Sequence, residues 1–196
     1  EKAGHGGTLD PLATGVLPIA LGEATKTVSY TMGKSKSYQF SLSWGAETST
    51  DDTEGEITRQ SDIRPLGADI DRVLEQFLGM IEQVPPDYSA IKIDGTRAYN
   101  LARQVGNGEP MPTLKPRQVR IDQFRRLGSD QASARFFVGC GKGAYIRALA
   151  RDLGRALGTA AHVTSLRRLS VGQFHADHAI SLDFFEKLTH SAAAFE

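Results

Sequence analysis

One aspartate lies in a segment whose backbone could expose it for reaction. Asp10 belongs to the sequence GHGGTLDPLATGVLPIALGEATK, residues 4–26, which is rich in glycine and contains two prolines. Pro11 biases the residue before it towards an extended conformation, so we expect Asp10 on a turn rather than in a helix. A carboxylate on such a turn can project into a cleft and act as a nucleophile or a base. The alternative is a turn aspartate that hydrogen-bonds its own backbone, and this segment alone favours that simpler interpretation.

A second segment, GCGKGAYIRALARDLG at residues 139–154, carries part of a nucleotide-binding pattern. Its glycines match G-x-G-x-x-A between an expected strand and an expected helix. However, no acidic residue follows at about twenty residues to bind a ribose. The Walker pattern fails as well, because no serine or threonine follows Lys142. Binding of a nucleotide cofactor is therefore the least favoured function.

The same region carries a row of basic side chains. Arg147, Arg151 and Arg155 are four residues apart, which places them on one face of the expected helix. Like charges at this spacing repel one another, so we expect an anionic partner. A bound anion is one candidate. The other is a solvated basic face paired with Asp152 or with acids elsewhere in the chain, and the pattern leaves both open.

Other spacings offer only weak metal sites. The segment STDDTEGE, residues 49–56, lacks the full set of ligands and the terminal glutamate of a calcium loop, which favours a solvated loop. His175 and His178 are three residues apart, but one cysteine and no further clustered histidine argue against zinc. The order of residues also supports no Ser-His-Asp triad. We therefore expect no metal site.

Composition favours a cytoplasmic protein that meets a polyanion. The net charge is zero, but residues 47–87 hold 11 acids and 3 bases, whereas residues 92–168 hold 15 bases and 5 acids. Such asymmetry predicts a side that faces a polyanion, although a mixture of solvated faces explains it equally well. Cys140 is the single cysteine, which excludes an internal disulfide and favours a reducing compartment. The longest apolar run, residues 16–21, is too short to cross a bilayer.

The elements that must position these residues are mixed without strict alternation. Tyr38, Phe40, Leu42 and Trp44 alternate with polar residues, which predicts a half-buried strand. Along the chain we expect a strand over 36–44, a polar loop over 46–56, a helix over 69–78 before two prolines, a helix over 98–104, a loop over 106–116, strands over 119–127 and 134–140, a turn at 141–143, a helix over 146–157 ending at Gly158, a strand or strand-turn over 162–174 and a helix over 182–188. This order favours an α+β fold over a doubly wound sheet.

Several long motifs occur in the order typical of one enzyme family. They are GHGGTLDPLATGVLPIALGEATK, SYQF, PPDYSAIKIDGTRAYNLAR, GKGAYIRALARDLG and HVTSLRRLSVGQF. From Gly4 to about Leu188 the chain resembles the TruB family of tRNA pseudouridine synthases. The resemblance implies the pseudouridine synthase fold, which is α+β with a mixed, largely antiparallel sheet and flanking helices. It also implies isomerisation of uridine to pseudouridine in the TΨC loop of tRNA (position 55 in tRNA numbering), on a flipped-out base and without cofactor or metal.

The resemblance implies three catalytic residues. Asp10 aligns with the catalytic aspartate of the family, and Arg147 aligns with the arginine that pairs with it. Tyr38 aligns with the tyrosine that stacks on the target base and can act as a base.

Four further positions are implied to bind the substrate. His5 aligns with the histidine that enters the T loop beside the flipped nucleotide, and Leu166 with an apolar residue of the uracil pocket. Lys142 and Tyr145 belong to the motif that frames this pocket. Gly6 departs from the family pattern, because many relatives carry threonine there.

We expect one catalytic domain over residues 1–196, without the N-terminal Lys-Pro segment of the family and without the C-terminal PUA domain of its bacterial members. The expected partner is the T arm of tRNA, bound by a monomer away from any membrane. Two alternatives remain. One is a non-catalytic RNA-binding or RNA-folding module, and the other is a synthase guided by RNA within a ribonucleoprotein.

Overall fold

The computed structural model describes residues 2–33, 35–89, 91–93, 95–105, 113–185 and 187. Its centre is a seven-stranded sheet in which six strands follow the order β13-β12-β4-β11-β10-β7. These strands are Phe174–His175, Ala161–Val171, Lys36–Trp44, Ser133–Cys140, Arg117–Ser129 and Gly79–Gln83, in that order. All five neighbouring pairs are antiparallel, and β2 (Ala13–Gly15) joins the sheet in parallel to β12.

The hydrophobic core lies between one face of this sheet and the helices α4 (Ile146–Ala156) and α2 (Gly67–Leu74). Strand β4 alternates as its sequence predicts, since Phe40, Leu42 and Trp44 are buried. Phe40 stacks on Phe136 of the neighbouring strand β11, with ring centroids 5.2 Å apart. Burial of each large apolar side chain contributes roughly 1.5–3 kcal/mol to folding. The expected α+β fold with a mostly antiparallel sheet is confirmed.

Most of the expected elements are confirmed. The predicted strands correspond to β4, β10, β11 and β12, and the predicted helix over 98–104 is α3 (Ala98–Val105). Gly158 follows α4 with a φ of +71°, and its N–H donates to Arg155 O at 3.0 Å. The strand or strand-turn expected over 162–174 is confirmed as β12 and β13, which a turn at Gly172 separates. Of the helix predicted over 182–188, residues 182–185 are helical, and residues 186 and 188 lie outside the described residues. Residues 106–112 of the predicted loop also lie outside them.

The helix expected over residues 69–78 is confirmed as helix α2, which ends at Leu74, followed by the 3₁₀ turn η2 over Glu75–Phe77. Gly79 then adopts a φ of +83°. The chain continues as the edge strand β7, which the sequence did not predict and whose Ile81 pairs with Val119 of β10. Pairing with β10 decides this strand.

The polar loop expected over residues 46–56 is confirmed from residue 49 onwards, but its first three residues are a strand. Residues Ala46–Thr48 form β5, which pairs with β6 (Ile57–Gln60). Glu47, Asp51 and Asp52 in this segment are buried rather than solvated. The partners of these carboxylates, described below, explain the burial.

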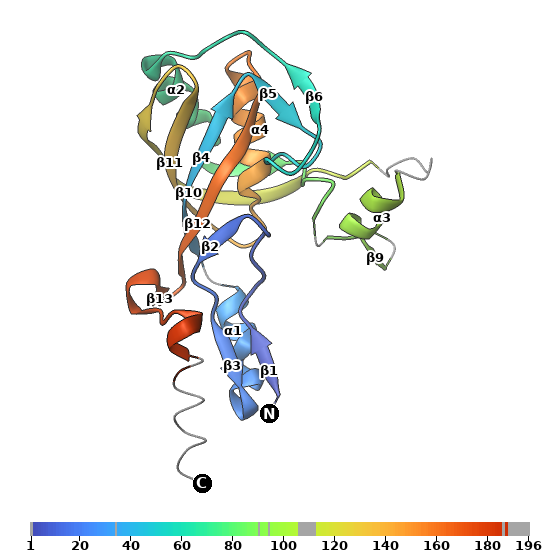
Figure 1. The fold of residues 1–196 in the computed structure, drawn as a ribbon, viewed down its shortest axis with the longest axis vertical. Coiled ribbons are helices and arrows are strands. Elements are labelled where there is room, and N and C mark those ends of the chain that lie inside the picture. The colour runs from blue at the N-terminus through green and yellow to red at the C-terminus, as the bar shows by residue number, and fades with distance from the viewer. Residues whose placement is uncertain are drawn as a thin grey trace.

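The segment that carries Asp10 crosses one end of the sheet. Strand β1 (Ala3–His5) pairs with β3 (Ile19–Leu21), and β2, between them in sequence, pairs with β12. The 3₁₀ helix η1 (Gly22–Thr27) and helix α1 (Val28–Met32) then lead towards β4. Together with β1 and β3 they extend beyond that end of the sheet (Figure 1). The hairpin of β8 (Lys92–Ile93) and β9 (Thr96–Arg97) and helix α3 project to one side (Figure 1). In the described ranges no helix is long and apolar enough to cross a membrane.

Candidate active site

Asp10 and Arg147 meet although 137 residues separate them in sequence. Arg147 Nε donates to Asp10 Oδ2 at 2.9 Å, and Arg147 Nη2 donates to Asp10 Oδ1 at 3.1 Å. Such a bidentate pair fixes the orientation of the carboxylate as well as its distance. The Arg147 side chain is 4% exposed and that of Asp10 is 32% exposed, so the pair reaches solvent from the carboxylate side.

The remaining donors of Arg147 are also engaged. Nη1 donates to Thr50 O at 2.9 Å and lies 3.6 Å from Asp52 Oδ2, and Nη2 donates to Tyr88 O at 2.9 Å. Arg147 lies in the first turn of α4, whose buried face packs into the core. The guanidinium therefore cannot turn away from Asp10 without breaking bonds to two further segments of the chain.

A cavity of about 380 Å³ is lined by Thr8 and Tyr145, which precede the two members of this ion pair in sequence, but by neither Asp10 nor Arg147. Its walls come from the loop at residues 6–8, the turn at residues 141–144 and the side chains of Tyr38, Tyr145 and Arg168. Burial raises the pKa of both Tyr38 and Tyr145, and the charge of Asp10 adds to the rise in each. The volume falls within the range of small-ligand sites, about 300–1,000 Å³.

Tyr38 keeps its proton at neutral pH. Burial raises its pKa to about 12, although Arg168 acts in the opposite direction. A phenol with this pKa is almost entirely neutral at pH 7. The side chain can offer its ring for stacking and its hydroxyl as a donor, and these roles are favoured over action as a base.

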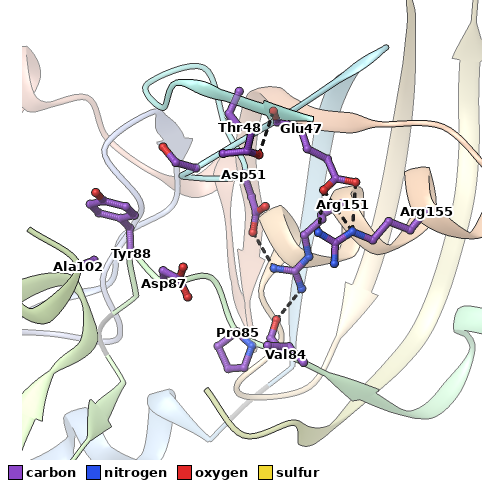
Figure 2. A pocket seen from close by; sticks show the side chains of 12 residues that line it. Glu47, Thr48, Asp51, Val84, Pro85, Asp87, Tyr88, Ala102, Arg151 and Arg155 are labelled. Carbon is purple, nitrogen blue, oxygen red and sulfur yellow. Dashed lines mark hydrogen bonds and ion pairs between the residues drawn. The ribbon is translucent and has the colours of Figure 1, made fainter. Parts of the chain in front are cut away.

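The other arginines of α4 are paired inside the protein. Arg151 Nη1 lies 2.9 Å from Asp51 Oδ2, and Arg155 Nη2 lies 2.7 Å from Glu47 Oε2. Arg151 Nε also lies 2.9 Å from Asp152 Oδ1. Figure 2 shows the Asp51 and Glu47 carboxylates reaching the two guanidinium groups beside a second cavity, of about 320 Å³.

The sequence left open whether Arg147, Arg151 and Arg155 of α4, the arginine row, face a bound anion or acids of the chain, and these pairs decide between the two. The partners are carboxylates of the chain itself, and they come from the segment expected to be a solvated loop. Glu47, Asp51 and Asp52 are buried beside the arginines of α4, whose charges they neutralise. Burial without such partners would cost several kcal/mol for each charge.

Asp51 should make the stability of the protein depend on pH. The residue is 6% exposed, and burial raises its pKa to about 6 despite the charge of Arg151. In the unfolded chain the same carboxyl titrates near about 3.9, so the folded protein binds the proton more tightly. The contribution of Asp51 to the free energy of unfolding should therefore fall as pH rises from about 4 to about 6, by up to about 1.4 kcal/mol per pH unit, and level off above.

Urea denaturation of the wild type and of Asp51→Asn across this range measures the effect. Asparagine tolerates the left-handed backbone at this position, where φ is 60°, so the substitution changes mainly the charge. The stability difference between the two proteins should shift with pH in the direction just given. A difference that stays constant would show that another group titrates.

A family model described as "TruB family pseudouridylate synthase (N terminal domain)" matches residues 1–146. This chain belongs to the TruB family. A second model, "tRNA pseudouridylate synthase B C-terminal domain", matches residues 147–194. The first match ends and the second begins within α4. Asp10 lies in the first match and Arg147 in the second, and residues of both matches pack into one hydrophobic core.

Curated relatives of this TruB chain carry the name tRNA pseudouridine synthase B. The protein of Brucella anthropi is 53% identical over 188 residues, which cover 95% of this chain and 57% of the relative. The protein of Bradyrhizobium diazoefficiens is 52% identical over 197 residues, which cover 100% of this chain and 56% of the relative. The chain thus spans little more than half the length of these relatives.

Solved structures similar to this TruB chain are parts of larger assemblies. A chain in the crystal structure of a Cbf5-Nop10-Gar1 complex has a TM-score of 0.70 at 29% identity, covering 98% of this chain and 48% of that chain. A chain of an H/ACA RNP bound to a substrate RNA containing 2′-deoxyuridine has a TM-score of 0.68 at 27% identity, covering 98% and 47%.

Three of the seven residues that the TruB resemblance singles out line the 380 Å³ cavity: Tyr38, Lys142 and Tyr145. Asp10 and Arg147 form their ion pair with each other but do not line it. Leu166 is not among the described residues that line the cavity. It is 5% exposed on β12 and belongs to the hydrophobic core, opposite Ala13 of β2. His5 is exposed on β1, directly before the loop at residues 6–8 that does line the cavity.

Three residues of this TruB site escape prediction from the sequence. Asp52 faces Arg147, and Gln83 exchanges two hydrogen bonds with the backbone of Tyr145, at 2.8 and 3.1 Å. Arg168 donates to the backbone of the cavity loop. Of the three, only Arg168 leaves a sign in the sequence, because it occupies an inward-facing position of a strand, where a charged residue is rare.

Proposed function

We propose that this chain isomerises uridine to pseudouridine in the TΨC loop of tRNA, with Asp10 as the reacting carboxylate. The observation that carries the proposal is the bidentate pair of Asp10 with buried Arg147, whose near neighbours in sequence, Thr8 and Tyr145, line a cavity together with Tyr38. Similarity to bacterial proteins named tRNA pseudouridine synthase B supports the same activity. A cytoplasmic location and a monomeric state belong to the same proposal.

The reaction needs a carboxylate but no change of oxidation state. The bond from ribose C1′ to uracil N1 breaks, the base rotates, and C1′ bonds to C5. The hydrogen of C5 leaves as a proton, and N1 takes up a proton. Asp10 can attack C1′, add to the base or take a proton from the sugar, and each route uses a carboxylate in a fixed orientation. Arg147 supplies that orientation in all three routes.

The cavity suits a base taken out of its stack. Extrusion of a base costs a few kcal/mol, and stacking on an aromatic ring returns about 1–3 kcal/mol. The neutral ring of Tyr38 lines the cavity and can make this contact. Lys142 lies exposed in the turn at the cavity wall, where it suits a phosphate. Recognition then follows the shape of the T arm rather than its sequence.

A synthase guided by RNA is the second candidate, because one similar solved chain belongs to an H/ACA RNP. Its 27% identity is well below the 53% identity to the Brucella anthropi protein, which favours the enzyme that acts alone. The non-catalytic RNA module loses part of its motivation, because the arginine row of α4 is paired internally.

Turnover by the bare protein separates these candidates. A T-arm stem-loop with tritium at C5 of its uridines should release tritium from one position without guide RNA or partner proteins, since C5 loses its hydrogen as the new bond forms. A hairpin of the same length with another loop sequence serves as the control and should release none. Binding without release would favour the RNA module, and release only after addition of guide and partners would favour the ribonucleoprotein.

A further inference from the structure

From its contacts we infer that Arg168 is a positioning residue for Asp10. Its buried guanidinium holds the backbone on both sides of Asp10 and so sets where the carboxylate meets the substrate. The inference rests on the proposed function and adds to it a charged residue on β12, a strand remote in sequence from Asp10.

Three nitrogens of Arg168 bind three backbone carbonyls of the Asp10 segment. Nη2 donates to Gly7 O at 3.1 Å and Nη1 to Thr8 O at 3.0 Å, both before Asp10. Nε donates to Val16 O at 2.7 Å, after Asp10. The backbone completes the set, because Val16 N donates to Arg168 O at 3.0 Å. The two ends of the segment are thus tied to one residue.

The charge of Arg168 has no partner that would explain its burial. The residue is 1% exposed, and in the described part of the chain no carboxylate forms an ion pair with it. Burial of an unpaired cation opposes folding by several kcal/mol, whereas an apolar side chain at this inward position would stabilise the sheet. General stability therefore does not account for an arginine here, but the three carbonyl contacts do.

The backbone of the segment leaves little room for movement at this point. Gly15 pairs with Arg168 in the β2–β12 register and has a φ of +101°. A Cβ atom at Gly15 would lie 2.1 Å from Arg168 O, so only glycine allows this approach. The segment is pressed against β12 after Asp10 and held by the guanidinium before it.

Arg168 also reaches the cavity in which the base is proposed to bind. It lines the cavity, and its hydrogen bond and charge lower the pKa of Tyr38, against the larger effect of burial. One cation thus links the cavity loop, the Asp10 segment and Tyr38. Displacement of a catalytic group by about 1 Å costs about 100-fold in rate. A lysine keeps the charge but cannot reach three carbonyls at once.

Arg168→Lys should therefore slow the chemical step about 10- to 100-fold. The rate is measured as single-turnover pseudouridine formation at saturating protein. Affinity for the T arm should stay within about threefold, because a buried side chain makes no phosphate contact. The matched control is Arg167→Lys on the same strand. Arg167 is exposed, and its substitution should leave the rate unchanged.

Hydrogen exchange without RNA gives a readout independent of activity. In Arg168→Lys, amides of residues 7–16 should exchange faster while those of β4 and β11 keep their protection. Arg168→Met tests the charge, and if it fails to fold the lysine variant still decides. A folded Arg168→Lys with the wild-type rate, or loss of protection across the whole sheet without a local excess, would overturn the inference. If the wild type forms no pseudouridine, the proposed function fails, and the exchange comparison alone decides whether Arg168 holds the segment.

Discussion

Asp10→Asn is expected to lower the single-turnover rate of pseudouridine formation by at least about 10⁴-fold, the scale on which loss of a reacting group acts. Asparagine has the shape of aspartate, and its oxygen still accepts a hydrogen bond from Arg147. It can neither attack a carbon nor take up a proton. The fold should persist, because Asp10 is about one-third exposed and Arg147 keeps Thr50, Tyr88 and Asp52 as partners.

Affinity for a T-arm stem-loop should stay within about threefold in this variant, because phosphate contacts carry most of the binding. A filter-binding assay beside the tritium-release assay measures both quantities. Asp69→Asn is the matched control, since Asp69 is an exposed carboxylate on α2 that pairs only locally with Arg72. Retention of more than about a tenth of the wild-type rate in Asp10→Asn would remove Asp10 from the chemistry.

Arg147→Met should lose both activity and stability. The substitution leaves Asp52, whose side chain is 3% exposed, without a cation and releases Asp10 from its bidentate hold. Loss of one partner from a buried ion pair costs about 3–5 kcal/mol in the free energy of unfolding. The single-turnover rate should fall by at least about 100-fold, because the carboxylate is no longer aimed. Urea denaturation and single-turnover assays measure the two effects.

Arg151→Met separates these two effects. Arg151 lies one helical turn further along α4 and also pairs with a buried carboxylate, Asp51, but it does not touch Asp10. Its substitution should cost similar stability and leave the rate within about tenfold of the wild type. If both variants lost the rate equally, general destabilisation would explain the Arg147 result, and the ion pair would not be a catalytic device.

Whether the sequence predicts a helix or strand depends on how far apart in the chain the residues that determine it lie. Strand β4 and helix α4 are predictable because their apolar periodicities are long and local. The burial of the acids in segment 46–56 is not predictable, because they resemble those of a solvated loop until α4, about 100 residues later, brings the arginines to them. Strand β7 is missed for the same reason, since its partner β10 decides it.

The residues of the candidate site also differ in whether the sequence alone predicts them. From residues alone, Asp10 is more simply a turn aspartate, and it becomes a candidate catalyst only through the ordered family motifs. Its partner Arg147 follows from those motifs too, but the bidentate geometry does not. Nothing in the sequence joins Arg168 to the loop at residues 6–8.

The sequence by itself determined a turn at Asp10, a helix with three arginines on one face and a family. These properties depend on local backbone preferences and on motif order. The tertiary structure alone decided which carboxylate meets which arginine, and that the arginine row is neutralised within the chain. It also decided that Arg168 holds the Asp10 segment. Ion pairs and buried charges depend on the packing of segments 100 to 152 residues apart in the chain, and local sequence carries no record of that packing.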